Sequence, residues 1–165
     1  MTFIRRKDFS GLSQEECDRL AFEKVVRSVS ACEQSTAKMR RKLEQAGYPA
    51  SSVDHAIDKA VRIGAIDDVR YSESLVRSTL ASGKGLRFAL KEVESLGVDV
   101  YGLESYNEHL ESGEEAELER AIDFLSRHPS RAKDKRGAAY RKLVSKGYAP
   151  SVAATASRLF VEGEG

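Results

Sequence analysis

A repeat with a period of fifty residues constrains this chain more than any other feature of its sequence. The segments 43–47, 93–97 and 143–147 each begin with an apolar residue and end in glycine, and they align without gaps. The same offset relates three arginines farther upstream, which are Arg27, Arg77 and Arg127. A period of this length indicates tandem supersecondary units, each of which contacts its neighbours.

Each repeat is predicted to hold three short helices. Apolar residues recur at helical spacing, and no segment alternates for long enough to indicate a strand. The clearest apolar stripe consists of Val53, Ile57, Ala60 and Val61. Glycine ends several of these segments, as is common after the last turn of a helix. We therefore predict an all-α fold, an elongated and curved array of three tandem three-helix units with about nine short helices.

The repeats also define the predicted domain boundaries. A flexible N-terminal segment is expected over residues 1–13, and the three repeats are expected to span 14–64, 65–112 and 113–165. The middle repeat is expected to begin at a helix capped by Asp67 or Asp68 and to end with a helix over Val100–Leu110. Its Gly83-Lys84-Gly85 turn separates the first two helices.

Charge is balanced in total but uneven along the chain. The 165 residues include 27 Lys and Arg and 26 Asp and Glu, for a net charge of +1. This balance argues against a general nucleic-acid coat, which would be strongly basic. The segment 92–119 is acidic and has no Lys or Arg, whereas 127–146 is basic with the single acid Asp134. Two interpretations remain open: solvated helix faces, or basic faces that meet an acidic or phosphate-bearing partner.

No residue pattern indicates catalysis. The adjacent carboxylates of Asp67 and Asp68 are suited to acid–base chemistry, but their place before a helix favours a cap. The three histidines have no metal-ligand spacing. The Gly83–Gly85 turn lacks the spacing and the preceding strand of a phosphate-binding loop. We expect no enzymatic activity, no metal and no cofactor.

The cysteines and the hydropathy suggest an intracellular setting. Cys17 and Cys32 have no Cys or His at metal-ligand spacing and are expected to be reduced thiols. We expect no signal peptide, and the sequence has no apolar run of about 18 residues. We therefore expect a cytoplasmic protein without a membrane contact.

The central repeat resembles the signature of the RecX family, which regulates the RecA recombinase. The resemblance is carried by the run 64–71 with its paired aspartates, by the 83–85 turn with Arg87, and by the helix that ends at Gly97. It extends to the flanks, roughly over residues 15–160. There Arg41-Lys42-Leu43 with Gly47-Tyr48 matches the first unit of the family, and Arg141-Lys142-Leu143 with Gly147-Tyr148 matches the third. The departures are Ser72, where the family usually has alanine, and the basic stretch Arg131–Arg136.

The resemblance implies a non-enzymatic modulator of RecA. A member of this family would bind the RecA monomer and the groove of the RecA–DNA filament, where the DNA inside the filament is a further candidate contact. There it would depress ATP hydrolysis and strand exchange, and so modulate homologous recombination, DNA repair and the SOS response. The chain itself would be a monomer.

We predict that the filament-facing surface is basic and lies beside the signature and its flanking repeats. Its predicted members are Arg70, Arg77, Lys84, Arg87, Lys91, Arg41, Lys42, Arg141 and Lys142. The residues expected to maintain the architecture are Asp67, Asp68, Tyr71, Gly83, Gly85, Gly47, Gly97 and Gly147. Two alternatives remain: a direct DNA-binding protein that uses 131–146 to meet phosphates, and a helical scaffold for an unrelated partner.

Overall fold

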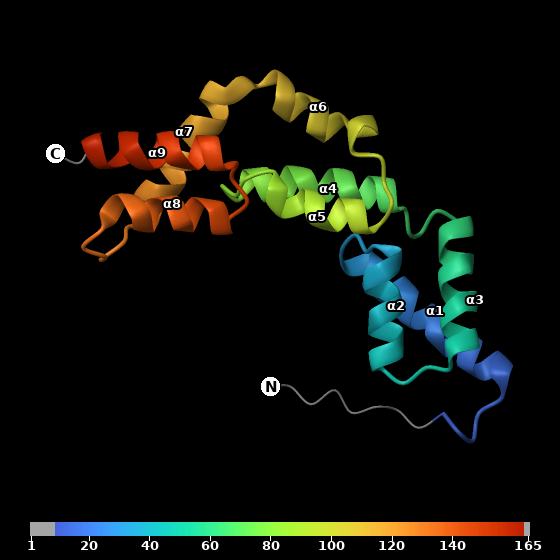
Figure 1. The fold of residues 1–165 in the computed structure, drawn as a ribbon. Coiled ribbons are helices and arrows are strands. Elements are labelled where there is room, and N and C mark those ends of the chain that lie inside the picture. The colour runs from blue at the N-terminus through green and yellow to red at the C-terminus, as the bar shows by residue number, and fades with distance from the viewer. Residues whose placement is uncertain (1–8, 164–165) are drawn as a thin grey trace. The chain divides into compact units, whose positions relative to one another are not determined.

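The computed structural model describes residues 9–163, and all regular secondary structure in this part of the chain is helical (Figure 1). It contains nine α-helices, one short 3₁₀ helix and no strand, which confirms the predicted all-α class. The elements are α1 (Gln14–Ala31), α2 (Thr36–Gln45), α3 (Ala50–Arg62), α4 (Asp68–Ala81), α5 (Arg87–Ser95), η1 (Val100–Gly102), α6 (Glu104–Glu111), α7 (Gly113–Arg127), α8 (Lys135–Ser145) and α9 (Pro150–Gly163).

The chain divides into two compact units, residues 1–71 (unit 1) and 72–165 (unit 2), and the division falls inside α4. The three repeats with their boundaries and the elongated, curved arrangement stay predictions. Residues 1–8 of the predicted flexible segment lie outside the described residues. Phe9, just after them, is buried, with its ring centroid 4.4 Å from that of Tyr48.

Unit 1 is a three-helix bundle whose core is formed by the apolar faces of α1, α2 and α3 (Figure 1). A capping box starts α1, because the Ser13 hydroxyl accepts from the Glu16 N–H while the Glu16 carboxylate accepts from the Ser13 N–H. Pro49 precedes α3, where its fixed backbone angle suits the start of a helix. Fully buried apolar members of this core include Ala21, Val25, Met39, Leu43, Val53 and Ala60.

Unit 2 contains two apolar clusters. The first joins α4, α5 and the segment around η1, and Val76, Val93 and Leu103 are completely buried in it. The second lies between α7, α8 and α9 and includes Leu143 and Ala156.

The helix predicted over Val100–Leu110 is interrupted. The Asp99 carboxylate accepts from the Tyr101 N–H and starts the short η1, and the extended backbone of Leu103 then separates η1 from α6. Leu103 is completely buried, so an apolar anchor fixes this break. None of the helices in residues 9–163 is long and apolar enough to cross a membrane.

Candidate functional site

The two adjacent aspartates of the signature serve different helices in unit 1. The Asp67 carboxylate accepts from the N–H groups of Val69 and Arg70, at 2.9 and 3.0 Å, and therefore caps α4. The Asp68 carboxylate instead accepts from the N–H of Thr36, at 2.8 Å, and from its hydroxyl. Since Thr36 is the first residue of α2, Asp68 ties the start of α4 to the start of α2.

Tyr71 strengthens the same contact between α4 and α2. Its side chain is buried, with 5% of the residue exposed, and the Lys38 Nζ donates to its hydroxyl. The same Nζ lies 4.8 Å from the centroid of the tyrosine ring. Tyr71 therefore combines core packing with a polar contact at the end of its ring.

Arg70 is neutralised inside unit 1. Its Nε lies 2.5 Å from Glu33 Oε1, and this hydrogen bond raises the pKa of Arg70. Both terminal nitrogens also donate to the Gly64 carbonyl oxygen at 3.3 Å. The guanidinium thus closes the connection between α3 and α4, and its charge is already paired.

Arg77 is neutralised in unit 2 by three carboxylates. Its guanidinium lies 2.9 Å from Glu104, 3.6 Å from Glu73 and 3.8 Å from Glu108. Two of these partners, Glu104 and Glu108, belong to α6 and to the acidic segment. Arg77 therefore does not add an unpaired charge to the predicted basic surface.

Glu73 also caps α6 from α4. Its carboxylate accepts from the backbone N–H groups of Glu104 and Ser105 at 2.6 and 3.0 Å. Burial alone would raise the pKa of Glu73, but hydrogen bonds from Ser105 and Glu104 outweigh burial and lower it.

The glycine turn of the signature packs against the turn between α8 and α9. The Gly85 N–H donates to the Lys146 carbonyl at 3.0 Å, and the Arg87 N–H donates to the Gly147 carbonyl at 3.1 Å. A Cβ on residue 85 would lie 2.3 Å from the Gly147 carbonyl carbon. Glycine is therefore required at position 85 by a close backbone approach, not by a bound phosphate.

Tyr148 completes the contact between these turns. Its hydroxyl donates to the Gly83 carbonyl at 2.8 Å, and burial raises the pKa of Tyr148 to about 12. Gly83 itself has φ +74°, the left-handed conformation that glycine adopts at the end of a helix. The signature turn thus joins the two apolar clusters of unit 2.

The remaining predicted cations fall into paired and unpaired groups. Lys42 donates to the Gln34 side chain, Lys142 donates to the His128 carbonyl, and Arg141 lies 3.7 Å from Asp134. The Lys84 ammonium sits 4.2 Å from the ring centroid of Phe88. Three predicted members are exposed and form no side-chain hydrogen bond or ion pair within residues 9–163: Arg41, Arg87 and Lys91.

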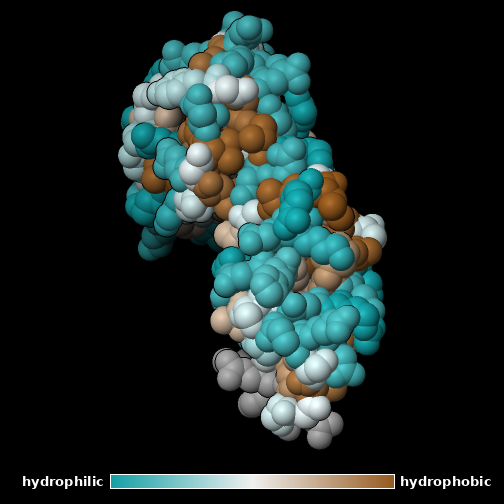
Figure 2. Space-filling model, turned by 90° about the vertical axis from the view of Figure 1, so that its right-hand side faces the viewer, coloured by the Kyte–Doolittle hydropathy of each residue, from teal (hydrophilic) through white to brown (hydrophobic). Residues whose placement is uncertain are grey.

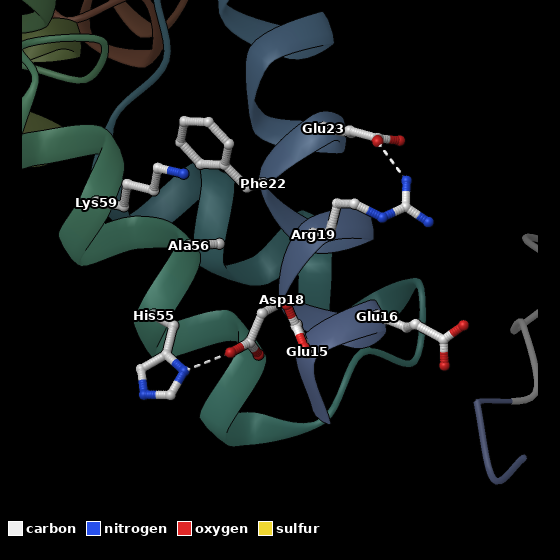
Figure 3. A pocket seen from close by; sticks show the side chains of 9 residues that line it. All are labelled: Glu15, Glu16, Asp18, Arg19, Phe22, Glu23, His55, Ala56 and Lys59. Carbon is white, nitrogen blue, oxygen red and sulfur yellow. Dashed lines mark hydrogen bonds and ion pairs between the residues drawn. The ribbon is translucent and has the colours of Figure 1, made fainter. Parts of the chain in front are cut away.

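Unit 1 also has a hollow of about 560 Å³ between α1 and α3, which sequence reasoning did not identify (Figure 3). Its polar side chains largely pair with one another, since Asp18 binds His55 at 2.8 Å and Arg19 binds Glu23 at 2.7 Å. Hydrogen bonds from Ser52 and His55 lower the pKa of Asp18. Among the described residues, no group of three His, Cys, Asp or Glu side chains is arranged to hold a metal ion.

Comparison with known proteins finds a similarity to RecX proteins. No protein-family model matches the chain. Over 110 residues, however, the chain is 32% identical to the regulatory protein RecX of Mycobacterium sp. (strain JLS), in a match that takes up 66% of this chain. It is also 29% identical over 79 residues to the regulatory protein RecX of Legionella pneumophila (strain Corby), which is 48% of this chain. The chain is similar in sequence to these RecX proteins. The matches span 59% and 53% of the length of these two RecX proteins.

The fold is shared with solved RecX structures. The crystal structure of RecX from Lactobacillus salivarius aligns with a TM-score of 0.61 and 16% identity, over 90% of this chain and 99% of that one. A crystal structure of regulatory protein RecX aligns with a TM-score of 0.60 and 19% identity, over 84% of this chain and 70% of that one. The resemblance to RecX that the sequence shows is therefore supported by similar proteins of that name, and the fold is the one that solved RecX structures have.

Proposed function

We propose that this chain is a non-enzymatic regulator that binds RecA, both as a monomer and as a filament on DNA, and lowers ATP hydrolysis and strand exchange. The similarity of the chain to proteins named regulatory protein RecX is the observation that carries this proposal. Through RecA the chain would modulate homologous recombination, DNA repair and the SOS response, acting as a cytoplasmic monomer.

The arrangement of charges supports an electrostatic contact in unit 2. Arg87 and Lys91 lie four positions apart on α5, so they share one helix face, and both are exposed. Unpaired, exposed cations of this kind speed association with an oppositely charged surface. Because the two units belong to one chain, weak contacts made by each would add through effective concentration.

The deciding experiment measures RecA ATPase activity on single-stranded DNA with increasing amounts of the full chain. We expect a dose-dependent decrease in ATP hydrolysis. Unchanged hydrolysis, with RecA filaments present and the added chain folded, would refute the proposal.

Direct DNA binding is the second candidate, and the exposed cations Arg131, Lys133 and Arg136 favour it. A salt titration on naked duplex DNA separates the two functions. Tight binding without RecA and a steep loss of affinity with salt would support direct binding. Binding that requires RecA would support the regulator.

A further inference from the structure

Helix α6 is held to the rest of unit 2 mainly by polar side chains. Within residues 104–111, all of which the structure describes, Ser105 is the only residue buried as a whole, and Tyr106 packs partly buried against an apolar cluster. The exposed residues of α6 are Glu104, Asn107, Glu108, Leu110 and Glu111. Most of them are hydrophilic, as is most of the face of the molecule that Figure 2 shows. Burial of apolar surface therefore contributes little to holding α6 in place.

The segments on both sides of α6 are anchored in the two apolar clusters of unit 2 (Figure 1). Leu103, which precedes α6, is completely buried. After α6 the chain turns at Gly113, with φ +76°, into α7, which buries Ala121 and Phe124. Elements with few buried apolar contacts are the ones that open locally while the rest of a protein stays folded. Helix α6 can thus open between two fixed ends without disturbing either cluster.

The contacts between α6 and α4 are ionic and open to water. Arg77 on α4 lies 2.9 Å from Glu104 and 3.8 Å from Glu108. The side chains of these three residues are 50%, 76% and 59% exposed, respectively. Ion pairs that are exposed to this extent contribute little to stability, and dissolved salt weakens them further.

The contact between α6 and α7 is also polar. The His109 side chain is 6% exposed, and the Arg120 guanidinium lies 3.1 Å from its Nδ1. Because a guanidinium can only donate, Nδ1 accepts, and the ring is neutral at this nitrogen. Burial lowers the pKa of His109 and favours this neutral form, with Glu117 3.9 Å from Nε2.

We propose that α6 is an electrostatic strap, a helix whose local opening controls how far Arg77 is neutralised. In the closed state Glu104 and Glu108 pair with Arg77, whereas in the open state Arg77 keeps only Glu73, 3.6 Å away on α4. Opening therefore makes the surface around Arg77 less negative and more accessible to an anionic partner. This inference goes beyond the proposed function, because the opening is a property of the chain alone.

Hydrogen exchange of the full native chain at low and high salt tests the strap. We expect the amides of α6 to exchange about tenfold or more faster than those of α5, whose Ala89 and Val93 are completely buried. Exchange in α6 should rise about threefold at high salt, whereas exchange in α5 should not change. Protection of α6 equal to that of α5, or exchange in α6 that is independent of salt, would overturn the proposal.

The variant Glu104→Gln/Glu108→Gln removes the two charges and keeps the size of the side chains. We expect α6 in this variant to exchange at low salt about as fast as wild-type α6 at high salt. The matched control Glu44→Gln/Asp58→Asn, at exposed positions of α2 and α3, changes the net charge equally and should leave α6 as in wild type. Slow exchange in α5 shows that each variant is folded, and Arg77→Gln replaces the double variant if α5 loses protection. A strap variant that exchanges as wild type does would refute the role of the ion pairs.

A RecA ATPase assay on DNA tests the effect of opening on Arg77 and rests on the proposed function. Because a RecA filament contains negatively charged DNA phosphates, we expect Glu104→Gln/Glu108→Gln to inhibit at about threefold lower concentration than wild type at low salt. The control Glu44→Gln/Asp58→Asn should inhibit as wild type does. Equal inhibition by the strap variant and wild type would overturn the control of Arg77 by α6. If wild type does not inhibit at all, the proposed function fails, and hydrogen exchange alone decides on the strap.

Discussion

At the scale of single residues, the paired aspartates show how a pattern suited to catalysis can be structural. Asp67 and Asp68 are adjacent in sequence, yet their carboxylates bind backbone N–H groups at the starts of two different helices, α4 and α2. A carboxylate at a helix N-terminus satisfies donors that the helix leaves unpaired and interacts favourably with its dipole. Both side chains are thus explained by the helix starts that they cap.

We predict that Asp68→Ala lowers the free energy of unfolding by about 1–2 kcal/mol, because Thr36 loses its partner for both the N–H and the hydroxyl. Equilibrium urea unfolding measures the change. Asp58→Ala, at an exposed position on α3, is the control and should remain within about 0.5 kcal/mol of wild type. A control as damaging as Asp68→Ala would contradict the capping role.

The lowered pKa of Glu73 predicts that the stability of the folded chain depends on pH. Because its pKa is lower in the folded chain, ionised Glu73 stabilises the fold above its ordinary pKa of 4.5, and this contribution is lost as the pH falls through the folded-state value. We expect Glu73→Gln to cost about 1 kcal/mol at neutral pH and the difference from wild type to shrink below about pH 4.

Urea unfolding at neutral and acidic pH measures this effect. Glu94→Gln, at an exposed position on α5, should show no comparable convergence. A difference between Glu73→Gln and wild type that is constant with pH would mean that the charge of Glu73 does not stabilise α6.

At the scale of elements, helix ends that glycine or proline marks could be predicted from the sequence. Breaks that depend on contacts with distant residues could not. Gly47 and Gly147 follow the ends of α2 and α8, and proline lies at the starts of α3 and α9, as the repeat indicates. The break at η1 was missed, because a helical hydropathy pattern does not reveal that Leu103 anchors an extended residue in the core.

The turn around Gly85 was predicted, but its partner was not, because Gly147 lies sixty-two residues away in sequence. Gly85→Ala would place a Cβ 2.3 Å from backbone atoms of Gly147 and Tyr148, which cannot move aside as a flexible side chain can. We predict a loss of about 2–4 kcal/mol in the free energy of unfolding. The measurement is thermal or urea unfolding of the full chain.

Gly102→Ala is the matched control in unit 2, since its Cβ would meet only Asp99 Oδ2, at 3.7 Å. A small effect of both substitutions would show that the two turns separate readily in solution, contrary to the contact in the structure.

At the scale of the whole molecule, sequence reasoning overestimated the number of available charges. It grouped nine cations by their position in the sequence, whereas the folded chain pairs Arg70 with Glu33 and Arg77 with α6 carboxylates. Glu33 and Glu104 lie 37 and 27 residues from these arginines, so hydropathy and charge runs could not reveal the pairs. Exposed cations without a partner among residues 9–163 are the members best suited to a charged partner, and in unit 2 these are Arg87 and Lys91.

The double variant Arg87→Glu/Lys91→Glu tests whether these two exposed cations contribute to inhibition. Under the proposed function, we expect it to require about tenfold more protein than wild type to inhibit RecA ATPase at low salt. The deficit should shrink at high salt, where exposed charges are screened. Lys24→Glu/Arg27→Glu on α1 changes the net charge equally and should inhibit as wild type does. If this control loses inhibition as strongly, net charge and not the α5 surface determines the effect.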